Sequence, residues 1–195
     1  TVPYNAKPFS NRSYIREALK EKGVQVEKED LTATVTAVRD AMDTIVPGPM
    51  RVMKWIEQEV AAAIDRGADQ LRWITPSGFV VTQRINLAEE VSCKVDRTHH
   101  KNATAPNLIH SLDASLLCLS TLRFNAPISL IHDSVLCRAT DMSVLSTLVR
   151  ETYMHLFAEH DYLKSWAEQI GAESDPPISG TLNPESVIES TYFFC

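Results

Sequence analysis

The chain has 195 residues, of which 44% are hydrophobic and 23% charged, so it can bury a core and is not a disordered chain. Nineteen Lys and Arg against 25 Asp and Glu give a net charge of −6, which argues against a self-contained basic nucleic-acid binder. The chain contains no apolar run of the roughly 18 residues that a membrane-spanning helix needs, and its four cysteines lack the CxxC spacing of a zinc site.

Three amphipathic helices are predicted before the first hairpin, because apolar residues recur there at intervals of three and four positions. Each helix is bounded by a residue that caps or breaks helices. The expected boundaries are Pro8 and Lys22 for the first helix, Asp30 or Thr32 and Pro47 for the second, and Pro49 and Gly67 for the third.

A β-hairpin is predicted next, with strands at residues 70–75 and 79–83 joined by the turn Pro76-Ser77-Gly78. Residues 84–104 are polar, and we expect them to be irregular. A basic patch lies in this stretch and consists of Lys94, Arg97, His99, His100 and Lys101.

The second half of the chain is predicted to alternate helices with one more hairpin. A helix from Pro106 to about Arg123 precedes strands at residues 127–130 and 135–137. A long helix capped by Asp141, a helical segment at residues 162–170 and a short helix capped by Asn183 follow. The predicted fold class is therefore helix-rich α+β with short antiparallel hairpins.

The second hairpin carries the chemically most informative residues of the chain. Its turn reads Ile131-His132-Asp133-Ser134, which places one carboxylate at the tip of a rigid ribbon. Carboxylate oxygens suit Mg²⁺, which keeps waters and substrate phosphates as its other ligands. Asp is also an ordinary turn residue, so the hairpin tip alone does not decide between a magnesium ligand and a solvated turn residue. A serine hydrolase is rejected, because neighbouring strand residues point to opposite faces.

The histidines offer a second candidate metal site. His99, His100 and His110 could ligate a metal, but no Cys or carboxylate partner has zinc spacing, and we expect the adjacent pair to be solvated. His110 and Asp113 lie three residues apart on one face of a predicted helix. They can form a simple surface pair or contribute to a site.

Taken in order, these segments resemble one family, the single-subunit DNA-directed RNA polymerases of the phage and mitochondrial type. The resemblance covers nearly the whole chain and corresponds to the C-terminal portion of such an enzyme. The matching stretches are residues 1–9 (TVPYNAKPF), 73–79 (WITPSGF), 105–113 (APNLIHSLD), 131–134 (IHDS) and 192–195 (YFFC).

The resemblance implies part of a right-hand polymerase. Residues 1–104 would belong to the fingers, with the first hairpin and a shortened promoter-reading loop, and residues 105–195 to the palm and the C-terminal foot. The aromatic foot would pack close to the catalytic centre.

The resemblance also implies a role for each candidate residue in two-metal nucleotidyl transfer. Asp133 would be the second of two Mg²⁺-binding aspartates, and His132 would position the strand terminus. Tyr4 would sense the ribose 2′-hydroxyl of the incoming nucleotide. His110 would face the product or the ribose, oriented by Ser111 and Asp113. The expected nucleic-acid contacts are Ser134, Lys94, Arg97 and Lys101.

The implied partners are a DNA template, an RNA product and ribonucleoside triphosphates, with no membrane and with a monomeric full-length enzyme. The other metal aspartate and the fingers Arg and Lys are absent from this chain, so we expect it to be inactive alone. We expect a phage enzyme acting in the cytoplasm of an infected bacterium, with the mitochondrial matrix as the alternative. The remaining alternatives are a family A DNA polymerase, whose palm turn typically reads HDE, and a catalytically dead nucleic-acid-binding fragment.

Overall fold

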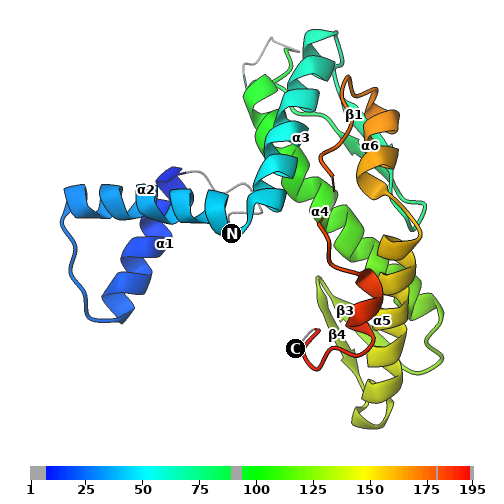
Figure 1. Cartoon of the computed structure of the whole chain (residues 1–195). Helices are drawn as coiled ribbons and strands as arrows, with labels where there is room; N and C mark the ends of the chain where they lie inside the picture. The colour runs from blue at the N-terminus through cyan, green and yellow to red at the C-terminus, as the bar shows by residue number, and fades with distance from the viewer. Residues whose placement is uncertain (1–7, 89–93, 179, 194–195) are drawn as a thin grey trace.

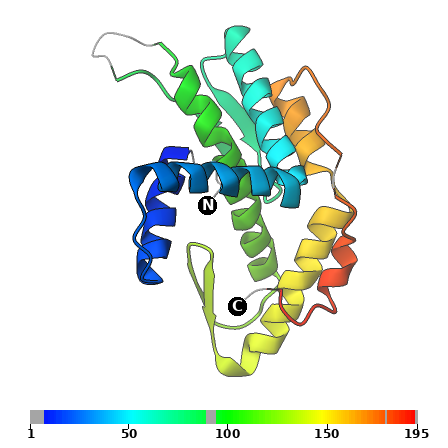
Figure 2. The same cartoon turned by 60° about the vertical axis from the view of Figure 1, so that its left-hand side comes forward.

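The computed structural model describes residues 8–88, 94–178 and 180–193 (Figure 1). Two helices, α1 (Pro8–Glu21) and α2 (Lys28–Ile45), form an arm that stands apart from the rest of the chain in Figure 1 and comes forward in the turned view of Figure 2. The two arm helices pack on each other, and Leu31 and Val35 are the buried residues of α2. The arm therefore contributes little to the main core.

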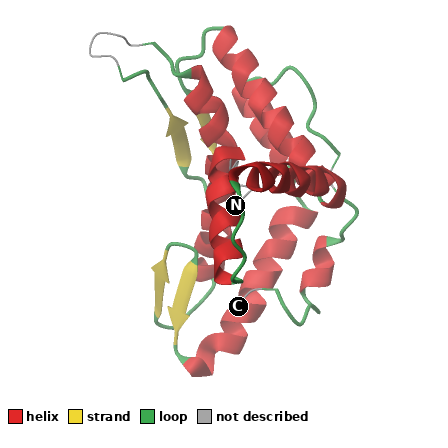
Figure 3. Cartoon of the chain, turned by 90° about the vertical axis from the view of Figure 1, so that its left-hand side faces the viewer, coloured by secondary structure: helices red, strands yellow, loops and turns green. Residues whose placement is uncertain are grey.

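The body of the molecule is organised along one long helix, α4 (Arg97–Leu122). Helix α3 (Pro47–Asp65) packs on one part of α4, and helix α5 (Met142–Ala158) packs on the other. Two separate antiparallel hairpins flank this helical frame (Figure 3). The remaining elements are β1 (Leu71–Ile74), β2 (Val80–Gln83), β3 (Ile128–Ile131), β4 (Ser134–Cys137), α6 (Tyr162–Ile170) and the short 3₁₀ helices η1 (Ala139–Asp141) and η2 (Pro184–Val187).

The upper core forms where α3, α4, α6 and the first hairpin meet. Trp55 and Trp166 pack edge to face with ring centroids 5.6 Å apart. The buried members of this core are Trp55, Ile56, Val60, Ala63, Leu71, Trp73, Ala105, Leu108, Trp166 and Ala167. Buried Glu59 joins it to a distant segment, because its carboxylate accepts the Glu173 N–H at 2.7 Å and the Ser174 hydroxyl.

The lower core holds the second hairpin in place. Buried Phe124, Leu145 and Val149 pack with side chains from both strands of that hairpin, including Val135 of β4. Phe193, near the end of the chain, packs against the same cluster. The hairpin that carries Asp133 is thus fixed by helix α5 and by the C-terminal segment.

The structure confirms the helix-rich fold with two short antiparallel hairpins, both at the predicted positions. The short helix after Asn183 is also confirmed as η2, and the Asn183 side chain accepts the Glu185 N–H. Asp141 does precede α5, but its carboxylate accepts from Arg138 Nε at 2.7 Å and makes no capping bond to the helix.

Two expected helix starts are wrong, while Pro49 lies in the first turn of α3 as expected. Helix α2 begins at Lys28, because Asp30 already lies in its first turn and Thr32 donates its hydroxyl to the Lys28 carbonyl within the helix. Helix α3 begins at Pro47, whose fixed φ suits the first helical position. Helix α4 begins at Arg97 and not at Pro106, so residues 97–104 are not irregular.

The early start of α4 has a local cause. Asp96 caps the helix by accepting the His99 N–H at 2.9 Å. One turn further on, the side chain of Gln83 on β2 donates to Thr104 Oγ1 at 2.9 Å and contacts the ring of His100. These bonds hold the first turns of α4 against the hairpin, and the helix continues through Pro106 although proline has no N–H to donate.

None of the described helices combines the length and the apolarity needed to cross a membrane.

Candidate active site

The tip of the second hairpin is a two-residue turn. Ile131 pairs with Ser134 across the ladder, which leaves His132 and Asp133 as the two turn residues. His132 has a φ of 56°, and it is the one residue other than glycine with a positive φ in the described part of the chain. A positive φ at the first turn position alone is the pattern of a type II′ turn, which suits the twist of a hairpin.

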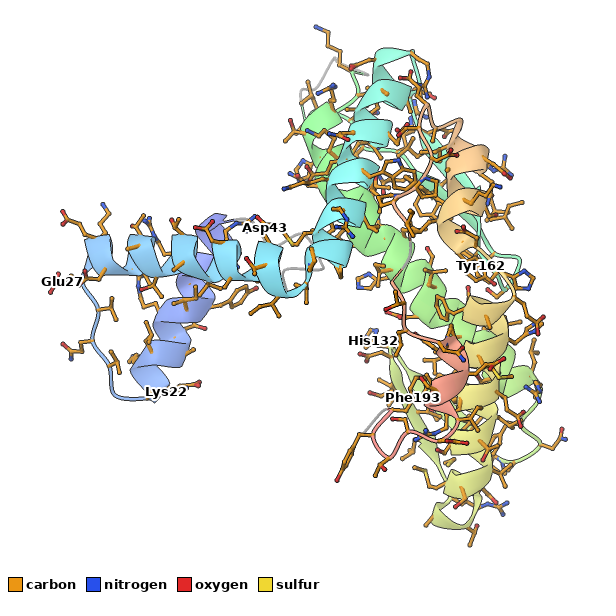
Figure 4. All side chains as sticks on the ribbon, in the orientation of Figure 1. Lys22, Glu27, Asp43, His132, Tyr162 and Phe193 are labelled. Carbon is orange, nitrogen blue, oxygen red and sulfur yellow. The ribbon has the colours of Figure 1, made fainter. Side chains whose placement is uncertain are left out.

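This tip faces one side of helix α4 across a pocket of about 560 Å³. The helix contributes residues three or four positions apart, which therefore lie on one face. The pocket is lined by His110, Asp113, Ala114 and Leu117 from the helix and by His132 and Asp133 from the turn. Figure 4 places His132 where the hairpin approaches α4. Four predicted site residues from two distant segments therefore share one pocket.

The electrostatics of the pocket favour a cation. Desolvation raises the pKa of the Asp113 carboxyl, the charge of His110 opposes this rise, and the charge of Asp133 adds to it. The two carboxylates therefore repel each other across the pocket. A cation between them would relieve this repulsion.

Comparison with known proteins shows the family. A family model described as DNA-dependent RNA polymerase matches residues 1–175. The chain belongs to this family.

The relatives include phage and organellar enzymes. The chain is 33% identical to the DNA-directed RNA polymerase of Pseudomonas phage phiKMV over 82% of its own length and 22% of that protein. It is 29% identical to DNA-directed RNA polymerase 1, mitochondrial, of Arabidopsis thaliana over its whole length and 22% of that protein. The chain thus spans about a fifth of the length of these relatives.

Ser111 does not line the pocket of Asp133. Its hydroxyl donates to the Asn107 carbonyl at 2.6 Å and accepts the Trp73 indole N–H at 3.3 Å. Ser111 lines a different pocket, of about 370 Å³, between α4, α6 and the first hairpin. Its observed contacts therefore join the first hairpin to α4.

The basic patch lies far from the pocket along the same helix. Arg97 precedes Asp113 by 16 residues in α4, a separation of about 24 Å along a helix. Both Nε and one terminal nitrogen of Arg97 donate to Asp65, at 3.0 and 2.7 Å, and this pairing raises the pKa of Arg97. Lys101 lies on the following turn of α4, and Lys94 precedes the helix.

Of the two histidines expected to be solvated, His99 is exposed as predicted, and the prediction for His100 is wrong. His99 is exposed and pairs with Asp96 at 3.0 Å. His100 is fully buried and accepts the Ile85 N–H at 2.9 Å, and burial lowers its pKa.

The two ends of the chain are described in part. Tyr4 lies outside the described residues, as does Cys195 of the foot. Phe193 packs edge to face on Tyr153 of α5, with the ring centroids 5.0 Å apart. The Arg150 guanidinium lies 5.3 Å from the Phe193 ring centroid. Tyr192 is 92% exposed. The C-terminal segment therefore docks through Phe193 beside the base of the site hairpin.

Sequence reasoning missed the apolar wall of the pocket. Ala114 and Leu117 line it beside the polar pair His110 and Asp113. The signal was available, because residues 110, 113, 114 and 117 follow the spacing of a single helix face.

Proposed function

We propose that this chain supplies the Asp133 side of an active site for template-directed RNA synthesis. The single observation that carries the proposal is the pocket that joins the turn His132-Asp133 to His110 and Asp113 of α4. Membership of the DNA-dependent RNA polymerase family supports the reaction type. The substrates would be ribonucleoside triphosphates, and the partners a DNA template and the growing RNA.

The residues of the pocket fit magnesium. Mg²⁺ is usually held by one or two carboxylates, with waters and substrate phosphates completing its shell. Asp133 is exposed at the hairpin tip, and Asp113 lies across the same pocket. When bound, Mg²⁺ lowers the charge of the triphosphate and stabilises the attacking and leaving oxygens. We assign the metal contact to Asp133, with a further aspartate supplied by a segment outside this chain.

The histidines of the pocket would position the reacting strands. The tight turn fixes the backbone of His132, so its imidazole can hold the strand terminus close to the metal ligand. His110 projects from the rigid helix on the other side, where it can meet the ribose or the product. Asp113 interacts electrostatically with His110 and would orient its ring. Ser111 would support this arrangement indirectly, through its bond to Trp73.

We further propose that residues 1–104 correspond to the fingers and residues 105–195 to the palm. Helix α4 spans this boundary without a break, so the two parts would be rigidly joined. Tyr4 and the foot would complete the site from the two ends of the chain. The residues Ser134, Lys94, Arg97 and Lys101 would contact the nucleic-acid backbone. The full-length enzyme would act as a monomer.

We propose a phage enzyme that acts in the bacterial cytoplasm. The match to the phage phiKMV polymerase has 33% identity, against 29% for the Arabidopsis mitochondrial enzyme.

The test is Asp133→Asn in a polymerase that contains this chain, with extension of a primed template as the readout. We expect loss of RNA synthesis over the whole range of Mg²⁺ concentration. The matched control is Asp141→Asn, which removes a carboxylate just beyond the same hairpin that is already paired with Arg138. Undiminished synthesis by the Asp133 variant would remove Asp133 from the metal site.

A further inference from the structure

A second cluster of metal-ligating side chains lies at the other end of helix α5. His155 is in the last turn of this helix, Glu159 is its C-cap residue, and His160 follows directly. One ligand atom from each of the three residues lies within 4.8 Å of the other two. In the described part of the chain this is the one group of three or more His, Cys, Asp or Glu side chains that meets this criterion. It lies outside the Asp133 pocket.

Local structure explains why the three side chains converge. His155 and Glu159 are separated by one helical turn, and His155 Nδ1 lies 2.8 Å from Glu159 Oε2. The chain then leaves the helix, which brings the His160 ring to 5.5 Å from that of His155, in an edge-to-face arrangement. The Tyr162 ring is tilted against that of His160, with the ring centroids 5.9 Å apart. Figure 4 shows Tyr162 at the junction of α5 and α6.

The surroundings leave room for a cation and its remaining ligands. His155 and His160 line a pocket of about 370 Å³ together with Tyr162 and Arg123. The positive charge of Arg123 is offset by its pairing with Glu151 at 2.7 Å. The last carbonyls of a helix carry partial negative charge, which favours a cation at this end of α5.

We propose that His155, Glu159 and His160 form a binding site for a divalent transition metal of the zinc type. Two imidazoles and one carboxylate are a ligand set of zinc proteins, with water in the fourth position. Imidazole nitrogen selects zinc, nickel or copper, whereas magnesium prefers oxygen ligands alone. A bound metal would clamp the end of α5 to the segment that leads into α6.

The competing explanation is an ordinary exposed His–Glu pair with a third side chain nearby. Such surface pairs contribute little and need no metal. The chain contains a matched example in Asp96 and His99, which are three residues apart in the sequence. His99 Nδ1 lies 3.0 Å from Asp96 Oδ2. His99 therefore serves as the control for nonspecific binding by exposed histidines.

The test is zinc titration of the purified, tag-free protein against a chromophoric zinc indicator. The variants are His155→Gln, Glu159→Gln, His160→Gln and the control His99→Gln, each also made with Asp133→Asn to remove the acidic pocket. Loss of partners outside the ligand shell of a metal costs about 10–100-fold in affinity, so loss of either histidine ligand should cost about a hundredfold. The control variant should bind zinc like the wild-type protein.

Two further measurements do not depend on the variants. X-ray absorption of the zinc-loaded protein should show nitrogen and oxygen ligands at about 2.0–2.1 Å. Zinc at a hundredfold excess over its dissociation constant should raise the melting temperature by about 5–11 °C, and magnesium should not. Absence of stoichiometric zinc binding, or binding that survives both histidine substitutions, would overturn the proposal.

Discussion

The positive φ of His132 allows the strain at the hairpin tip to be separated from the role of its side chain. Three substitutions are informative. Ala at position 132 removes the imidazole and keeps the strain, whereas Gly removes both. Asn tolerates the left-handed region and retains a polar side chain. A comparison of His132→Gly with His132→Ala therefore isolates the backbone contribution, because both variants lack the ring.

The expected difference follows from the observed backbone angle. A φ of 56° costs a residue that has a Cβ roughly 1–2 kcal/mol of conformational free energy relative to its usual conformations. Glycine avoids this penalty but loses about 0.4–1 kcal/mol through the greater freedom of the unfolded chain. The Gly variant should therefore be about 0.5–1 kcal/mol more stable than the Ala variant. For a chain of this size the difference corresponds to about 1–4 °C in melting temperature.

Calorimetry of the three variants at one pH and without divalent metal measures this difference. RNA synthesis by polymerases that carry the same changes then tests the side chain. We expect both Gly and Ala to reduce synthesis to a similar extent, although Gly is the more stable. An Ala variant that melts at or above the temperature of the Gly variant would refute the strain argument. Full synthesis by the Gly variant would show that the imidazole is dispensable.

Four other predictions test the rest of the molecule. Because the pKa of Asp113 is raised in the folded chain, its contribution to stability is present below pH 3.8 and is lost as the pH rises through the folded pKa. The melting temperature of Asp113→Asn should therefore rise relative to that of the wild-type protein from pH 4 to pH 7. The pKa of buried His100 is lowered, so its contribution to stability is present above pH 6.5 and is lost as the pH falls through the folded pKa. Thermal melts between pH 5 and 8 should show this loss, and equal melting temperatures across that range would contradict it. Glu59→Ala should lower the free energy of unfolding by about 3 kcal/mol, measured by urea denaturation, because the Ser174 hydroxyl and the Glu173 N–H lose their acceptor. Glu59→Gln should lower it less. Tyr4→Phe should relax discrimination against deoxyribonucleotides more than it slows synthesis, as measured by competition between the two nucleotide types.

The hairpins could be predicted from the sequence because their signals are local. Pro76-Ser77-Gly78 and His132-Asp133 are short turns between β-rich segments, and the pairing follows from their length. The face of α4 that meets the hairpin tip was also accessible, since His110 and Asp113 share one side of a helix. The pocket between them was accessible only through the family resemblance, because no local rule relates residue 113 to residue 133.

The start of α4 was missed because Pro106 competes with the local capping signal of Asp96. Pro106 is a strong signal for the first turn of a helix, and residues 97–104 are polar. Gln83 overrides this signal from another element, because its amide contacts the His100 ring and Thr104 and makes their burial possible. The same contacts explain why His100 is buried although its neighbour His99 is solvated. A polar segment becomes helical here because its polar groups find partners within the fold.

The geometry of the candidate site depends on α4 more than on either hairpin. Leu108 of this helix belongs to the upper core, and Leu116 packs against the lower core that holds the Asp133 hairpin. His110 and Asp113 lie on the two turns between these anchors. A bend in that stretch would rotate both side chains away from the hairpin tip while each core stayed packed. The candidate site would therefore be lost without unfolding, whereas changes in the α1–α2 arm would leave the pocket intact.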